Sequence, residues 1–233
     1  MKRKNISLIL AVLMTLSIML GGCGTSQEEV AGTVTPAATE AAEERIMSIG
    51  RIEGGTYTNN YVGFAMDLDS SWTYYSAEEL QELPENMAEI FEGSELGDTI
   101  NPMKQFTDML AENIDMMATI NVLYQKLDMQ GRLAYALMDE EEILDAVMEQ
   151  SDEMIEAYAQ AGMEVSSMEK VAVTFLGEAH MGLKTASIME GVPYYTLQLF
   201  VHNLGEYSAT ITFASFVEDQ TDSLVALCYP ISE

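Results

Sequence analysis

Three tight turns in the second half of the chain join segments in which every second residue is apolar. This alternation predicts strands that place one face in a core, and Gly177, Gly191 and Gly205 mark the turns between them. Strands joined by such short turns run antiparallel, so this region is confined to an antiparallel sheet. The expected strands cover 171–175, 178–189, 195–201 and 207–213.

Helical periodicity before these strands predicts one long amphipathic helix from Met138 to Ala161, with Gly162 as its C-terminal stop. Its apolar face would consist of Ile143, Leu144, Val147, Met148, Met154, Ile155, Tyr158 and Ala161.

A second helix is expected to begin at a capping box formed by Ser76 and Glu79. Pro84 would kink or divide it, and Gly93 and Gly97 would end it. A last helix is expected over 218–228. The apolar stripe of the second helix would contain Leu80, Leu83, Met87, Ile90 and Phe91.

Further strands are predicted in the first half of the chain. The segment 57–68 alternates as one strand, Trp72 to Tyr75 forms a short one, and 106–127 reads as a hairpin that turns near Glu112 and Asn113. A helix over 109–117 is the alternative for part of this hairpin. The fold class is therefore α+β: a twisted antiparallel sheet of about six or seven strands covered by helices, in one domain over 55–233. We expect Trp72 and Phe213 in its core.

The domain resembles the PsbP-like fold, which the photosystem II extrinsic protein PsbP shares with the Ran-binding nuclear-import factor. It is also similar to lipoproteins of Gram-positive bacteria that carry such a domain. The resemblance implies an α/β/α sandwich and a mostly non-enzymatic family. It is carried by residues 55–59 with Phe64, 71–76, 173–178 and 205–212.

The N-terminus has the pattern of a secretory signal. Lys2, Arg3 and Lys4 precede an apolar run over 6–20, and Gly22 precedes Cys23. Leu-Gly-Gly-Cys resembles the lipobox of bacterial lipoproteins, so we expect residues 1–22 to be removed and Cys23 to carry a lipid such as palmitate. The alternative, a transmembrane anchor, would need about 20 apolar residues.

Residues 23–54 are small, polar or acidic, which predicts a disordered tether between the membrane and the domain. After Cys23 becomes the first residue, the chain holds 38 acidic and seven basic residues, a formal charge of −31. Such a charge argues against nucleic-acid binding. We expect attachment to the membrane through the lipid on Cys23, an envelope protein or cell-wall component as partner, and a monomeric domain.

The common catalytic motifs do not occur in this sequence, and we expect neither a cofactor nor a metal. His180 and His202, with Glu178, would be the only histidine-based metal site, and solvated or core histidines are the alternative. Cys228 follows an apolar stretch, which favours a buried structural thiol.

A calcium loop is the second metal hypothesis. Asp67, Asp69, Ser71 and Glu78 have the spacing of its ligands, but Trp72 stands where such loops need glycine, and an ordinary turn is the alternative.

The acidic face of the 138–161 helix is the most distinctive surface feature. It could take a cation or a basic partner, whereas a solvated face is the simpler interpretation. Its residues are Glu141, Asp145, Glu149, Asp152 and Glu156. The leading functional hypothesis is a lipid-anchored, non-enzymatic binding or scaffolding domain outside the cytoplasm. A small-ligand or metal-binding envelope protein is the alternative, and an enzyme comes third.

Overall fold

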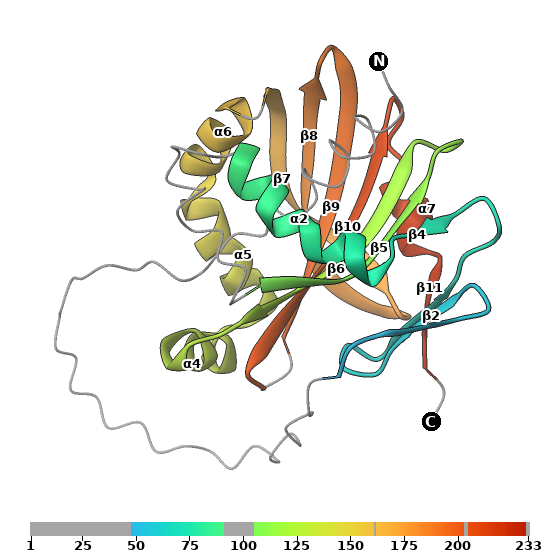
Figure 1. Cartoon of the computed structure of the whole chain (residues 1–233). Coiled ribbons are helices and arrows are strands. Elements are labelled where there is room, and N and C mark those ends of the chain that lie inside the picture. Colours follow the sequence, from blue (N-terminus) through green and yellow to red (C-terminus); the bar gives the residue numbers. More distant parts are fainter. Residues whose placement is uncertain (1–47, 91–104, 161, 203–204, 232–233) are drawn as a thin grey trace, which may run out of the picture.

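The computed structural model describes residues 48–90, 105–160, 162–202 and 205–231. Within these ranges the chain forms a seven-stranded and a four-stranded antiparallel sheet with several helices (Figure 1). The predicted α+β class and the helix-covered antiparallel sheet are confirmed. The large sheet has the order β4 (Thr73–Tyr74), β5 (Gln105–Asn113), β6 (Ala118–Lys126), β10 (Tyr207–Phe216), β9 (Val192–His202), β8 (Glu178–Met189) and β7 (Met163–Phe175).

Two of the predicted turns are two-residue hairpin loops. Leu176 and Gly177 have φ angles of 54° and 87°, and Glu190 and Gly191 have φ angles of 49° and 81°. Positive φ at both central positions gives a loop whose twist matches that of the flanking strands. The hairpin of β5 and β6 is also confirmed and excludes the helical alternative. Its turn lies over 114–117, just after the predicted position.

The small sheet was not expected from the sequence. It consists of β1 (Arg51–Glu53), β2 (Thr56–Asn59), β3 (Phe64–Asp67) and β11 (Cys228–Pro230). The single strand predicted over 57–68 is wrong, because the chain reverses after Asn59, whose side-chain oxygen accepts a hydrogen bond from the Val62 amide at 2.9 Å. β1 lies before residue 55, inside the predicted tether.

The C-terminal segment also differs from the prediction. The helix expected over 218–228 is only α7 (Thr221–Val225), and Cys228 begins β11, which pairs with β3. Leu224 and Val225 are buried, so the single apolar turn of α7 is enough to cover this part of the large sheet.

In the described ranges, α2 (Ala77–Ile90) follows β4, and three helices lie between β6 and β7: α4 (Met129–Leu137), α5 (Glu140–Glu149) and α6 (Ser151–Gln160). The capping box of Ser76 and Glu79 is confirmed, and α2 continues through Pro84 without division. The long helix predicted over 138–161 is two helices separated at Gln150, and α4 was not predicted. Phe91, Gly93 and Gly97 lie outside the described residues.

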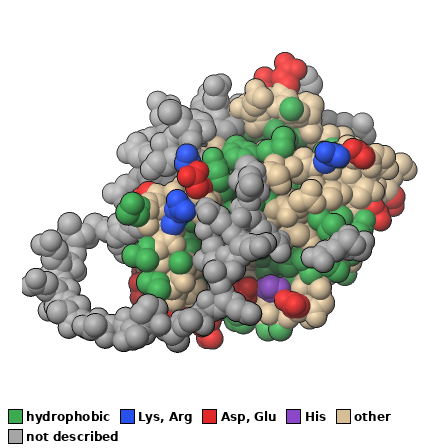
Figure 2. Space-filling model, turned by 90° about the horizontal axis from the view of Figure 1, so that it is seen from below, with side chains coloured by type: hydrophobic (Ala, Val, Ile, Leu, Met, Phe, Trp, Pro, Cys, Tyr) green, Lys and Arg blue, Asp and Glu red, His purple; other side chains and the backbone are tan. Residues whose placement is uncertain are grey.

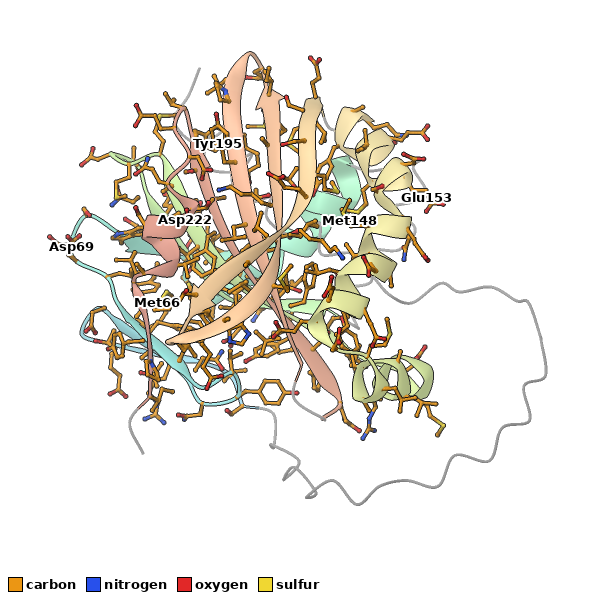
Figure 3. The ribbon with its side chains drawn as sticks, turned by 180° about the vertical axis from the view of Figure 1, so that it is seen from behind. Met66, Asp69, Met148, Glu153, Tyr195 and Asp222 are labelled. Carbon is orange, nitrogen blue, oxygen red and sulfur yellow. The ribbon has the colours of Figure 1, made fainter. Side chains whose placement is uncertain are left out.

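Two apolar cores flank the large sheet. One lies between this sheet and α2, α4, α5 and α6; the other lies between the two sheets and includes α7. The second face of the large sheet therefore packs on the small sheet and on α7, so helices lie against both faces of the large sheet. Met66 belongs to the inter-sheet core and Met148 packs against the core under the helices (Figure 3).

The two residues expected in the core differ in burial. Phe213 on the central strand β10 has no exposed surface. Trp72 is only partly buried and packs against the inter-sheet core from outside, so its predicted place in the core is wrong. It stands beside β4, a two-residue strand at the edge of the sheet, where fewer neighbours can cover a side chain.

Candidate functional site

A buried row of polar side chains crosses the helix-facing side of the large sheet. Gln198, Thr212 and Asn121 are direct neighbours on β9, β10 and β6, and each is at most 3% exposed. Thr196 pairs with Thr185 on β8 and continues the row. We call these five residues the polar row. Buried amides and hydroxyls are costly unless they are hydrogen-bonded, which makes the row unusual for a face covered by helices.

A small cavity lies over one end of the polar row. Its volume is about 10 Å³, the size that admits one water molecule. Three groups of side chains line it: Thr185, Thr196 and Gln198 of the polar row; Ser187 and Tyr194 of β8 and β9; and Tyr158, Met163 and Val165 of α6 and β7.

Tyr194 is the most distinctive residue of this cavity. It is 2% exposed, and its buried hydroxyl has no hydrogen-bond partner among the described atoms. Burial raises the pKa of Tyr194 and also that of the neighbouring Tyr158, so both phenols stay protonated. The cavity therefore offers neutral donors and acceptors, suited to a water or a small uncharged polar group.

A second buried polar cluster joins the two sheets. Both carboxylate oxygens of Asp108 on β5 accept hydrogen bonds from the Gly50 amide at 2.9 Å, and the Tyr57 hydroxyl donates to Asp108 at 2.6 Å. Asn59 donates to the hydroxyls of Tyr57 and Tyr124 at 2.7 and 2.8 Å. Burial raises the pKa of Asp108 even though these hydrogen bonds favour its charged form.

Glycine is required at position 50, because the backbone there approaches the side chains of Tyr57 and Asp108 closely. A Cβ atom there would stand 2.3 Å from the Tyr57 ring and 2.7 Å from the Asp108 carboxylate. Asp108 itself lies where the pairing of β5 with β6 shifts register, between Thr107 and Met109. The irregularity coincides with the residue that contacts the small sheet, so the cluster is a joint between the sheets.

The histidine site predicted from the sequence is not assembled as a metal centre. His180 Nδ1 lies 2.7 Å from Glu140 Oε1, and the other oxygen of Glu140 accepts from the Met181 amide at 2.9 Å. This pair ties the start of α5 to β8. The side chain of His202 lies outside the described residues. In the described ranges, no three His, Cys, Asp or Glu side chains are placed to hold a metal ion.

The calcium-loop residues are engaged in local hydrogen bonds. Asp67 accepts from the Thr56 hydroxyl at 2.6 Å, and Asp69 accepts from the amide and hydroxyl of Ser71. Glu78 lies in the first turn of α2. These contacts are those of an ordinary turn, in which the side chain of Asp69 folds back onto its own backbone.

The predicted acidic face is divided between α5 and α6 and partly paired. Lys170 of β7 forms ion pairs with Asp145 at 2.5 Å and with Glu141 at 3.6 Å. Within the described part of the chain, no ion pair is found for the rest of the acidic face, which consists of Glu149, Asp152 and Glu156. Figure 3 shows Glu153 of α6 directed away from the sheet.

Cys228 is partly buried, and burial raises the pKa of its thiol, which keeps it protonated and unreactive. Cys23, the predicted lipidation site, lies outside the described residues. No described helix is both long and apolar enough to cross a membrane.

The sequence pattern at the polar row predicts a solvated face, which is the opposite of what the structure has. Alternation of Thr210 and Thr212 with Ile211 and Phe213 is the usual mark of a strand with one solvated face. The helices cover that face, so the same pattern places hydroxyls in the interior. The Asp108 cluster could not be found from spacing, because Asp108 lies 58 residues after Gly50 and 49 residues after Asn59.

Comparisons with known proteins give no family. No family model matches this chain, and no curated protein matches it significantly. Among solved structures, it is similar to cyanobacterial PsbP (CyanoP) from Synechocystis sp. PCC 6803, with 10% identity and a TM-score of 0.41 over 84% of this chain and 98% of that chain. It is also similar to a protein from Bacteroides thetaiotaomicron VPI-5482, with 12% identity and a TM-score of 0.38 over 81% of this chain and 50% of that chain. The chain thus spans half the length of the second protein. At such identities both likenesses concern the fold alone.

Proposed function

We propose that this protein is a lipoprotein anchored on the outer side of a bacterial membrane, where its domain binds another envelope component and performs no chemistry itself. The observation that carries the anchoring is the sequence Leu20-Gly21-Gly22-Cys23 at the end of a basic and apolar leader. In this proposal residues 23–47, which precede the described residues, act as a tether. A flexible chain of that length spans about 25–30 Å on average.

Three partly buried ionisable groups support a binding role. Asp108 is held by Gly50 and Tyr57, His180 is held by Glu140, and Lys184 forms an ion pair with Asp219 at 2.6 Å. Each of these groups ties one element of the fold to another. A general acid or base must instead present a proton or a lone pair toward a substrate.

The test of anchoring is metabolic labelling with palmitate in cells that express the full chain or its Cys23→Ala variant. We expect label on the natural chain alone, and we expect the variant to be unprocessed or released from the membrane fraction. Equal labelling of both proteins would refute the lipoprotein assignment. Crosslinking in intact cells, followed by mass spectrometry, then identifies the bound component.

A small-ligand function is the second candidate, favoured by the unpartnered Tyr194 hydroxyl at the cavity over the polar row. Ligand pockets usually occupy about 300–1,000 Å³, so α6 would have to move away from the sheet to admit more than a water. Native mass spectrometry of protein purified from its host tests this candidate. A retained small molecule that is lost in a Gln198→Leu variant would support it, and a bare chain would count against it.

A further inference from the structure

Helix α4 exposes a continuous apolar stripe. Met129, Leu133 and Leu137 are 87%, 60% and 74% exposed. Spaced four residues apart, they fall within an arc of about 80° on the helix surface. On the opposite side, Tyr135 is 5% exposed and packs into the core under the helices. The helix is thus fixed to the domain by one face while its other face, rich in large apolar side chains, lies in solvent.

The fold fixes this helix in place. Asp128 caps its N-terminus by accepting a hydrogen bond from the Gly131 amide at 2.8 Å. The Leu127 amide donates to the Glu206 carbonyl at 2.8 Å, which ties the start of α4 to the segment before β10. A helix of nine residues is marginal in isolation, so these contacts hold the stripe in a defined direction.

The described chain enters the domain at the same end. Gly50 is bound to Asp108 on β5, and Gln105 at the beginning of that strand pairs with Gln125, just before β6 leads into α4. Asp108 lies three positions after Gln105, a distance of roughly 10 Å along a strand. The described chain therefore begins at the same end as α4, and Figure 1 places α4 and the start of the small sheet at one end of the molecule.

The charge at this end differs from that of the rest of the protein. Three of the five Lys and Arg residues in the described ranges, Arg51, Lys126 and Arg132, are found here. Glu206 lies 3.9 Å from Lys126 and 4.0 Å from Arg132, so opposite charges offset one another. Figure 2 views this end and shows apolar side chains beside basic and acidic ones. A processed chain with a formal charge of −31 (38 acidic and seven basic residues) thus presents a locally balanced surface next to the start of its described part.

We infer that α4 lays its apolar stripe on the bilayer that holds the lipid anchor, so that the domain rests on the membrane in one orientation. This inference rests on the proposed function, because the anchor keeps the domain near the lipid. Interfacial helices bury their apolar face about 5–10 Å into the boundary between headgroups and acyl chains. Three side chains are few for binding from solution, but a tether makes the encounter intramolecular and raises the effective concentration.

Photo-crosslinking in intact membranes tests the inference. Full-length protein carries p-benzoylphenylalanine in place of Leu133 or, as a control, in place of Ile155, a 39% exposed apolar residue on α6. After irradiation, mass spectrometry identifies the adducts. We expect lipid adducts at position 133 at least about tenfold above position 155, because only α4 would reach the acyl chains. Adding Met129→Gln and Leu137→Gln should reduce the yield at 133 severalfold, whereas Ile188→Gln, on β8, should not.

Every other product contradicts the inference. A crosslinked pair of identical chains would assign the stripe to a second copy, an adduct with a different protein would assign it to a protein partner, and no adduct would leave it in solvent. Palmitate labelling of Cys23 in the same cells separates the two proposals. If Cys23 is labelled but no lipid adduct forms, the docking of α4 is overturned and the lipid anchor stands. A lipid adduct without label overturns the anchor and leaves the docking in place.

Discussion

Two buried tyrosines place the same hydroxyl group in opposite environments. Tyr57 donates to the Asp108 carboxylate and accepts from Asn59, whereas the Tyr194 hydroxyl lies beside a cavity without a partner among the described atoms. A hydrogen bond to a charged group contributes about 1.5–3 kcal/mol, while an unsatisfied buried hydroxyl costs about 1–3 kcal/mol. The same substitution at these two residues therefore compares a bonded hydroxyl with an unbonded one.

Replacing each tyrosine by phenylalanine should change stability with opposite sign. We expect Tyr57→Phe to lower the free energy of unfolding by about 2 kcal/mol and Tyr194→Phe to raise it by about 1 kcal/mol. Urea denaturation of the mature chain without its lipid measures both values. A loss of stability in Tyr194→Phe would instead mean that a water molecule occupies the cavity and bonds to this hydroxyl.

Central and edge strands determine what an aromatic side chain contributes. Phe213 on β10 is enclosed between the sheets, so Phe213→Ala should destabilise the protein by about 3–5 kcal/mol. Trp72, beside β4 at the edge, is partly exposed, and Trp72→Ala should cost less than half as much. Thermal or urea unfolding, followed by far-ultraviolet circular dichroism, compares them. Equal losses would show that β4 is as well packed as the centre of the sheet.

The acidic face of α5 and α6 is the element on which the sequence suggested a cation site. Lys170 already pairs with Asp145 and Glu141, which relieves part of the repulsion, and the remaining carboxylates are on helices without a third ligand group nearby in the described ranges. We therefore expect a solvated face.

Melting experiments distinguish a solvated face from a binding site. Calcium and magnesium should each raise stability by less than about 1 kcal/mol, and sodium chloride should replace them at higher ionic strength. A true site at one hundred times its dissociation constant would add about 2.7 kcal/mol. The double variant Asp145→Asn, Glu149→Gln is the control. A saturable micromolar calcium effect that this variant lacks would establish a site.

At the scale of the whole molecule, the sequence predicted what depends on neighbours in the chain. The hairpin turns at Gly177 and Gly191 and the capping box at Ser76 follow from local φ preferences and local hydrogen bonds. The small sheet could not be predicted, because β11 pairs with β3 across most of the chain and an Asn side chain creates the reversal after β2. The burial of the polar row could not be predicted for a similar reason. The alternation within a strand does not show which of its two faces the rest of the fold covers.

The Asp108 cluster joins the two sheets and should make the stability of the whole fold depend on pH. Burial raises the pKa of Asp108 above its ordinary value of 3.8, so the folded chain binds this proton more readily than the unfolded chain. The stabilising contribution of Asp108 is then complete below pH 3.8 and is lost as the pH rises through the raised pKa.

An Asp108→Asn variant removes this titration and isolates its effect. The free energy of unfolding of the natural chain minus that of the variant should fall as the pH rises from 4 to 7.5, since only the natural chain must ionise a buried carboxyl. Asp145→Asn, which removes an exposed carboxylate paired with Lys170, is the control. Urea denaturation at matched ionic strength measures both differences. A difference that rises with pH for Asp108→Asn would mean that the hydrogen bonds from Gly50, Tyr57 and Asn59 outweigh burial and lower the pKa of Asp108.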